Sequence, residues 1–350
     1  MIRLPAEWAA QSAVMLVWPT PEGPRRDSLH AVEEELCVLA AAVTRYQPLL
    51  VVAADSLHAA HISVLLRRTG EHTDRLHMVH APSDDIWCRD YGPLTIIEPD
   101  SGEARLIDFR FNGWGGKYPA PHDDRLTTAL QGTGVFGNSP CNHSSLVLEG
   151  GALETDGHGT LLATERSIVD DARNPGKDRL QIEEELRRQL GLRRFLWLQH
   201  GQLAGDDTDG HIDTLARFAD PHTLVYQSCD DPDDDHYAPL QAMTAELRSF
   251  HDIDGQPYRL LPLPLPPAMH SDDGRRLPAG YANFLIINGA VLAPVYGVNT
   301  DSRALKQLAN AFPGRRIEPV PCRELINDNG SLHCATMQFP RALRVQATNP

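Results

Sequence analysis

The sequence lacks several features that mark particular classes of protein. It has no uninterrupted apolar run of the roughly 18 residues that a membrane-spanning helix needs. Residues 1–5 lack the basic and then apolar stretch of a secretory signal, so we expect a cytoplasmic protein. Basic residues number 32 against 47 acidic ones, which leaves a net charge of −15. This balance disfavours nucleic acids and anionic membranes as partners and favours cationic ones.

Cysteine and nucleotide-binding motifs are also sparse. The six cysteines are scattered over 350 residues, and no two have CxxC spacing. A disulfide framework or a cysteine-based zinc site is therefore not expected, and most of the thiols should be reduced and buried. Residues 112–118 (NGWGGKY) are rich in glycine but match neither GxGxxG nor a P-loop. The sequence predicts no cofactor.

What the chain does contain is a recurring unit. Four segments have the pattern of β-hairpins, with apolar strands around turn-forming residues: 94–111, 151–169, 213–228 and 282–297. Their turns recur about every 60 residues, a rhythm typical of repeat architectures.

A helix and then an apolar strand are predicted after the hairpins. The clearest helix covers 178–190, with an apolar stripe and a stop at Gly191; the stripe consists of Leu180, Ile182, Leu186 and Leu190. Helix 178–190 is followed by a predicted strand at 195–198. The same order is predicted for helix 237–250 with strand 258–265 and for helix 302–312 with strand 316–321. Near the N-terminus, helix 29–45 and strand 49–53 follow the apolar segment 12–18. About five such units suggest a closed, radial α/β arrangement, and a plain two-domain α/β protein is the alternative.

Residues capable of chemistry cluster where the hairpins begin. Asp90 precedes the first hairpin, Glu149 precedes the second, His211 and Asp213 open the third, and Cys334 follows the last. In a radial arrangement these residues would line one pocket. Each also has a plain structural interpretation: Asp90 pairs with Arg89 or caps a turn, Glu149 is a turn acid, His211 and Asp213 form a hydrogen-bonded pair, and Cys334 is a core thiol.

A thiol, an imidazole and several carboxylates together favour chemistry on a planar cation. A guanidinium presents five donors in a fixed fork that pairs with carboxylates, and a thiolate is a strong nucleophile. Imidazole delivers protons near neutral pH. Two other classes stay open. Residues 206–213 (DDTDGHID) could hold a divalent ion for a metal-dependent hydrolase, although their spacing matches neither an EF-hand nor HExxH. A binding module for cationic ligands without turnover is the third.

Six segments, taken in order, are similar to those of the agmatine deiminase family, which includes the bacterial peptidyl-arginine deiminases. They are LPAEWAAQSAVMLVWP (4–19), WCRDYGP (87–93), NGWGGKY (112–118), LEGGALETDGHGTLLATE (148–165), DDTDGHIDTLARF (206–218) and GSLHCAT (330–336). The resemblance implies one catalytic domain over residues 1–350, folded as a pentein-like, pseudo-symmetric five-bladed α/β propeller. It also implies hydrolytic deimination without cofactor or metal.

Site residues carry over from this resemblance position by position. Cys334 matches the family's nucleophile and His211 its general acid/base. Asp90 and Asp213 match the carboxylates that grip the guanidinium, and Glu149 matches the acid that holds the substrate nitrogens. Trp87 and Trp114 correspond to pocket walls.

Agmatine is the expected substrate, hydrolysed through a covalent thiouronium on Cys334 to N-carbamoylputrescine and ammonia in polyamine biosynthesis. Peptidyl-arginine or another guanidino compound is the alternative. The chain departs from the family pattern at residues 329–331, which replace part of a glycine run, and at Met337, where a glutamine is common. Both departures concern how the far end of the substrate is held. A homodimer is expected by default only.

Overall fold

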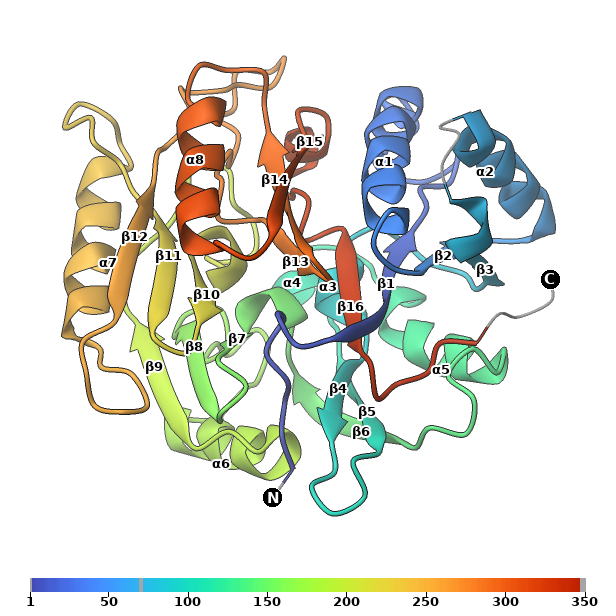
Figure 1. Ribbon diagram of the computed structural model, residues 1–350, viewed down its shortest axis with the longest axis horizontal. Coiled ribbons are helices and arrows are strands. Elements are labelled where there is room, and N and C mark those ends of the chain that lie inside the picture. The colour runs from blue at the N-terminus through green and yellow to red at the C-terminus, as the bar shows by residue number, and fades with distance from the viewer. Residues whose placement is uncertain (1, 69–71, 347–350) are drawn as a thin grey trace.

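The computed structural model describes residues 2–68 and 72–346 of the chain. Five small sheets surround a common centre, and most of the longer helices lie toward the outside (Figure 1). This is the predicted five-bladed α/β propeller. No helix in the described ranges is long and apolar enough to cross a bilayer.

Each sheet repeats one strand pattern. A first strand pairs antiparallel with a second, which pairs parallel with a third that follows a connecting segment. The parallel pair needs a crossover, and helices fill that role in a βαβ unit. Four sheets follow the chain in order: β4 (Leu94–Ile97), β5 (Ala104–Arg110) and β6 (Cys141–Val147); β7 (Glu154–Thr155), β8 (Thr160–Thr164) and β9 (Arg194–Leu198); β10 (Ala216–Asp220), β11 (Thr223–Gln227) and β12 (Arg259–Leu263); β13 (Leu285–Ile287), β14 (Ala290–Val295) and β15 (Arg316–Pro321).

The fifth sheet closes the ring by joining the two ends of the chain. Strand β16 (Thr336–Pro340) pairs antiparallel with β1 (Gln11–Val17). Strand β1 then pairs parallel with β2 (Leu49–Ala53), and β3 (Leu76–His80) adds a fourth strand. The hairpin of this blade is thus assembled from residues more than 300 positions apart. Cys334, two residues before β16, is held by that closure.

The helices begin and end close to where local sequence signals place them. Helix α6 starts with a reciprocal capping box between Asp178 and Gln181 and ends at Gly191 in the left-handed conformation. The described helices are α1 (Leu29–Thr44), α2 (Ser56–Arg68), α3 (Cys88–Tyr91), α4 (Gly113–Gly116), α5 (Leu126–Gly132), α6 (Arg179–Leu190), α7 (Tyr237–Ser249) and α8 (Asp301–Ala311). In Figure 1, the short helices α3 and α4 lie near the middle of the view, where the loops of several blades meet.

The four predicted hairpins are all present, and so are the predicted helices α1, α6, α7 and α8. One detail of the α6 stripe was wrong. Leu180 is exposed, whereas Ile182, Leu186 and Leu190 are fully buried. Leu180 lies in the first turn of the helix, one residue after its start, and precedes the first buried position of the helix, Ile182. Helix α2, helix α5 and strand β3 were not anticipated.

Candidate active site

The segment just before the first strand of each sheet carries one or two buried side chains of the candidate site. Asn283 occupies this position before β13 and was not anticipated from the sequence, although the same positional rule would have selected it. The other members are those predicted: Asp90 before β4, Glu149 before β7, His211 and Asp213 before β10, and Cys334 before β16. All six of these side chains are buried. Residues at equivalent positions of the repeated units therefore lie together in one buried cluster.

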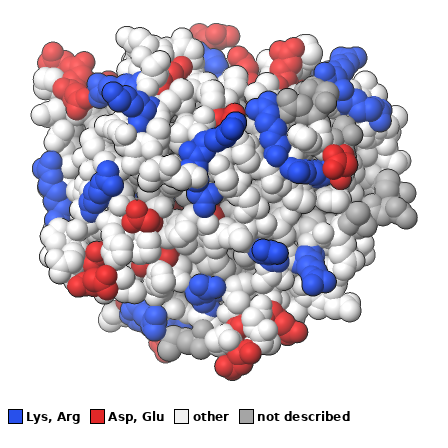
Figure 2. Space-filling view, in the orientation of Figure 1, with Lys and Arg blue, Asp and Glu red and all other residues white. Residues whose placement is uncertain are grey.

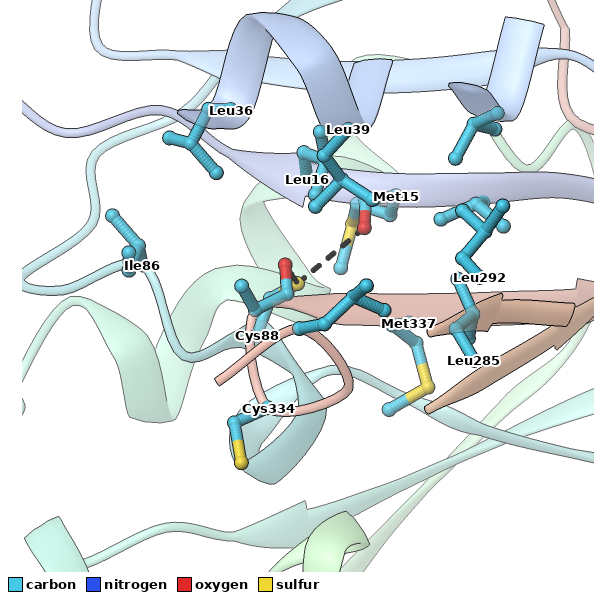
Figure 3. Packing of buried hydrophobic residues seen from close by; sticks show 14 of the residues in the cluster. Met15, Leu16, Leu36, Leu39, Ile86, Cys88, Leu285, Leu292, Cys334 and Met337 are labelled. Atoms are coloured by element: carbon cyan, nitrogen blue, oxygen red, sulfur yellow. Dashed lines mark hydrogen bonds between the residues drawn. The ribbon is translucent and has the colours of Figure 1, made fainter. Parts of the chain in front are cut away.

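Cys334 differs from its buried neighbour Cys88 in what surrounds the sulfur. The Cys88 thiol lies among apolar side chains and contacts the carbonyl oxygens of Met15 and Ala335 (Figure 3). The side chain of Cys334 points away from that apolar group. Its sulfur lies 3.2 Å from Asn283 Nδ2 and 3.6 Å from Asp213 Oδ2. Burial, together with the charges of Asp213 and Asp90, raises the pKa of the Cys334 thiol well above its ordinary value.

Asp213 is held by one oxygen only. Its Oδ2 accepts from His333 Nδ1 at 2.8 Å, whereas its buried Oδ1 has no hydrogen-bond partner among the described residues. Burial acts against the charged carboxylate, but the hydrogen bond and charge of His333 outweigh it, and the pKa of Asp213 lies below its ordinary value. The unpartnered oxygen of this ionised carboxylate can therefore accept a hydrogen bond from a bound ligand.

His211 lies between two acids and is itself fully buried. Its Nε2 is 3.2 Å from Glu149 Oε2, and its Nδ1 is 3.5 Å from Asp90 Oδ1. Burial disfavours the imidazolium, but the charges of Asp90 and Glu149 outweigh it and raise the pKa of His211 to about 9. The ring is therefore an imidazolium at neutral pH. Its Nδ1 is buried and has no hydrogen-bond partner in the described structure.

Asp90 is oriented by two donors. Its Oδ1 accepts from the backbone N–H of Gly151 at 2.9 Å, and its Oδ2 accepts from the indole Nε1 of Trp114 at 2.8 Å. Burial raises the pKa of Asp90 to about 6, against the opposing charge of His211. Trp114 itself sits at φ +55°, within a glycine-rich turn. Gly113 has φ +70°, and a Cβ on it would lie 2.0 Å from the carbonyl oxygen of Tyr118, so only glycine fits there.

Glu149 faces away from the open space of the site. Both of its oxygens accept from Arg173 Nε, at 2.8 and 2.9 Å, and Oε2 also contacts His211. Arg173 is nearly fully buried and is fixed in turn by Asp170, Asp209 and the carbonyl oxygen of Thr208. Arg173 was not predicted, because it lies in the irregular segment between β8 and α6, where no periodicity or turn motif marks it.

A cavity of about 190 Å³ leads from the surface to the thiol. Trp87, Trp114, Asp90 and Cys334 line it. Asp213 and His211 are not among the lining residues but contact them, since Asp213 Oδ2 lies 3.6 Å from the Cys334 sulfur and His211 Nδ1 lies 3.5 Å from Asp90 Oδ1. Trp87 is packed between the Arg25 guanidinium, 4.8 Å from its ring centre, and the backbone of Gly330. Met337 does not line the cavity but is buried, with its sulfur 3.7 Å from Arg89 Nη1.

The wall of this cavity is strongly acidic. Among the described residues, Arg25 is the one basic residue that lines it, and it is already paired with Asp85 and Asp328. The lining acids are Asp84, Asp85, Asp90, Asp123, Asp207 and Asp328. Burial raises the pKa of Asp123 to about 8 and also raises those of Asp207 and Asp328. The face shown in Figure 2, by contrast, has both signs of charge interspersed. A cation that enters would relieve the crowding of these acids.

The acids of residues 206–213 are held by protein groups. Asp206 accepts from the backbone of Thr208 and Gly210, Asp207 from Tyr118 and Asn329, and Asp209 from Lys117 and Arg173. Over residues 2–68 and 72–346, no group of three or more His, Cys, Asp or Glu side chains is arranged to hold a metal ion.

Comparison with known proteins gives one family. Residues 3–340 match Porphyromonas-type peptidyl-arginine deiminases. The agmatine deiminase of Stutzerimonas stutzeri is 33% identical over 357 residues, covering 96% of this chain and 95% of its own. A structure from Porphyromonas gingivalis, provisionally named an arginine deiminase, has a TM-score of 0.91 and 44% identity, covering 98% of this chain and 99% of its own. A C. jejuni agmatine deiminase, a cysteine-to-serine variant with substrate bound, has a TM-score of 0.89 and 31% identity, with 98% of both chains covered.

Proposed function

Since the chain belongs to the family of agmatine deiminases and bacterial peptidyl-arginine deiminases and is a hydrolase acting on a guanidino C–N bond, we propose that agmatine is its substrate. The products would be N-carbamoylputrescine and ammonia. The proposal assigns the nucleophile to Cys334, the general acid/base to His211, and the guanidinium-binding carboxylates to Asp90 and Asp213.

The observation that carries this proposal is the convergence of two carboxylates and an imidazole, packed closely against Gly151, beside the Cys334 thiol. A Cβ on Gly151 would lie 2.7 Å from both Asp90 Oδ1 and His211 Nδ1, and 3.1 Å from Asp213 Oδ2. The unpartnered Asp213 Oδ1 and His211 Nδ1 belong to the same cluster. A planar guanidinium offers donors to both carboxylates at once and places its carbon near the thiol.

Substrate binding activates the nucleophile in this scheme. Without a cation, burial and two carboxylates hold the Cys334 thiol protonated, because its pKa is raised. A guanidinium between Asp90 and Asp213 offsets their charge, which favours the thiolate at the moment when its target is in place. The enzyme is thereby unreactive toward neutral electrophiles.

The chemistry proceeds in two halves. The sulfur forms a bond to the guanidinium carbon, and His211 gives its proton to one nitrogen of the tetrahedral adduct. The C–N bond then breaks, ammonia leaves, and a thiouronium remains on Cys334. Water, deprotonated by His211, adds to the same carbon; the C–S bond breaks and releases the ureido product.

Glu149 receives a different role from the one that the resemblance implied. Its oxygens face His211 and Arg173 and not the cavity, so we place it behind the imidazolium. In that position it stabilises the charged ring and fixes its orientation, as a buried acid does for a catalytic histidine.

The acidic wall favours a substrate with a second positive charge. Asp207, Asp328 and Asn329 line the cavity and are partly exposed, unlike the buried Asp90 and Cys334, and the Arg25 charge is already neutralised. The amine of agmatine would offset these acids, whereas the carboxylate of free arginine would be repelled and a peptide-linked arginine would offer no charge there.

The test is ammonia and ureido release from agmatine, L-arginine and an N-acetyl-arginine amide. We expect agmatine to give the highest kcat/KM. Cys334→Ala should abolish release, while Cys141→Ser, which alters a partly exposed thiol on β6, should leave it unchanged. A chelator should have no effect on turnover. Inactivation by a chelator but not by thiol alkylation would instead support a metal-dependent hydrolase. A preference for the amide would overturn the choice of agmatine and leave the class of reaction standing.

A further inference from the structure

We infer that His333, held between Glu7 and Asp213, is a positioning residue of the deimination site: it binds one oxygen of Asp213 and leaves the other to the substrate. This inference rests on the proposed function, because it assigns a purpose to the free oxygen of Asp213. It concerns the residue before the nucleophile, whose side chain has no other part in the chemistry above.

The contacts of His333 define which ring nitrogen serves Asp213. Its Nδ1 lies 2.8 Å from Asp213 Oδ2, and its Nε2 lies 2.7 Å from Glu7 Oε2 and 3.1 Å from Arg217 Nη2. An ionised carboxylate accepts hydrogen bonds and does not donate them, so Nδ1 is the donor to Asp213. The ring is buried from solvent and held on its other side by Glu7 and Arg217.

The second acid, Glu7, is fixed from three directions. Its Oε2 accepts from Arg217 Nη2 at 2.8 Å, and its Oε1 accepts from the backbone N–H of Ile286 at 2.6 Å. Arg217 in turn donates through Nε to Glu154 at 2.6 Å and through Nη1 to the carbonyl oxygen of Phe284 at 2.7 Å. Burial alone would raise the pKa of Glu7, but Arg217 and His333 outweigh it and hold that pKa far below its ordinary value.

This network crosses the centre of the propeller. Glu7 precedes β1, Glu154 lies in β7, Arg217 lies in β10, and His333 precedes β16. Since β1 and β16 belong to one sheet, these four residues join three of the five blades behind the nucleophile. Its members have fixed positions because each is buried and has at least two partners.

Asp213 is where the network reaches the reacting atoms. With Oδ2 bound by His333, its carboxylate cannot rotate freely, and the unpartnered Oδ1 remains for a guanidinium N–H. Without His333, the buried acid would lose the donor that keeps it ionised. The charged groups that face Asp213 and His333 are His211, Arg217, Glu7, Asp90, Glu154, Arg89 and the Cys334 thiol.

The backbone of the nucleophile does not depend on the His333 ring. The N–H groups of His333 and Cys334 both donate to Asn283 Oδ1, at 2.8 and 3.2 Å. A change of the His333 side chain therefore leaves this anchor of Cys334 in place. The effect of the ring on Asp213 can be separated from an effect on the loop.

Two isosteric substitutions distinguish the two sides of the ring. In His333→Asn the amide nitrogen takes the place of Nδ1 and keeps the bond to Asp213. In His333→Gln it takes the place of Nε2, keeps the bond to Glu7 and loses Asp213. We expect His333→Gln to lose roughly a hundredfold in kcat/KM, the size expected when a charge-assisted hydrogen bond is removed, and His333→Asn to lose less than about tenfold. The acid limb of the kcat/KM profile should move to higher pH in His333→Gln only.

A second readout keeps the test independent of turnover. The rate at which chloroacetamidine, a planar cation, alkylates Cys334 depends on Asp90 and Asp213 but not on any substrate. It should fall in His333→Gln, and less in His333→Asn, even if agmatine is not the substrate. If His333→Gln does not fold, Glu7→Gln replaces it and should shift the acid limb in the same direction. Equal losses in both His333 variants with an unmoved acid limb would overturn the inference.

Discussion

Asn283 holds Cys334 by both ends of its amide: its Oδ1 accepts from the Cys334 backbone N–H and its Nδ2 lies against the thiol, each at 3.2 Å. The same Oδ1 accepts from His333, so one buried side chain sets the position of the loop and also donates toward the sulfur. This residue precedes the fourth hairpin, at the position where the proposed catalytic residues Asp90, Glu149 and Asp213 precede the other three.

Asn283→Asp should therefore damage catalysis more than stability. The substitution keeps the acceptor for the two backbone N–H groups, removes the donor to sulfur and adds a negative charge that disfavours the thiolate. We expect kcat/KM to fall about a hundredfold or more, as for loss of a hydrogen bond to a charged group. Steady-state kinetics with thermal unfolding would measure both effects. Asn310→Asp, on the exposed face of α8, is the matched control, and equal activity of the two variants would contradict the assignment.

The pH dependence of kcat/KM should be bell-shaped with limbs near pH 6 and pH 9. Asp90, with a pKa of about 6, must be ionised to bind the guanidinium, so activity rises as pH increases through 6. His211, with a pKa of about 9, must be protonated to release ammonia, so activity falls above pH 9. Glu149→Gln removes an acid that raises the pKa of His211 and should move the alkaline limb to lower pH. An unmoved limb in that variant would separate Glu149 from the imidazole.

Gly151 is expected to tolerate no side chain. An alanine Cβ would lie 2.7 Å from Asp90 Oδ1 and from His211 Nδ1, so both of these groups would have to move from the positions assigned to them in the reaction. Gly151→Ala should lower kcat/KM by at least two orders of magnitude, since small displacements of reacting groups cost about 10²-fold. Gly314→Ala is the control, because a Cβ there would meet nothing within 4 Å and its φ is not positive. Full activity of Gly151→Ala in ammonia release would refute the placement of the guanidinium.

Much of this fold and site follows from local sequence. The hairpins and α6 have turn residues, apolar periodicity and caps within a few positions of one another, so their existence could be predicted without tertiary information. The positions of Asp90, His211 and Asp213 relative to the hairpins then suggested one pocket. The burial of Leu180 was predicted wrongly, because apolar periodicity alone does not show which positions in the first turn of a helix have a packing partner.

The rest depends on contacts between distant parts of the chain. Glu7 and His333 are 326 positions apart and meet only because β1 pairs with β16. Arg173 reaches Glu149 from an irregular segment, and no periodicity marks it. Buried ion networks of this kind depend on tertiary geometry, so residue type alone could not reveal that Glu7 and Arg217 lie behind the nucleophile.

Arg217 should be one of the largest contributors to stability among the polar residues. It is fully buried and pairs with Glu7 and Glu154, and burial of two acids without a cation is unfavourable. Arg217→Met should lower the free energy of unfolding by about 3–5 kcal/mol, the cost of breaking a buried ion pair from one side. Urea unfolding measures this, with Arg188→Met on the exposed face of α6 as the control, where about 0.5 kcal/mol or less is expected. Arg217→Met/Glu154→Gln should recover part of the loss, because one of the two acids left unpaired is then neutral. If the double variant is less stable than Arg217→Met, the destabilisation arises from lost packing against Phe284 and not from uncompensated charge.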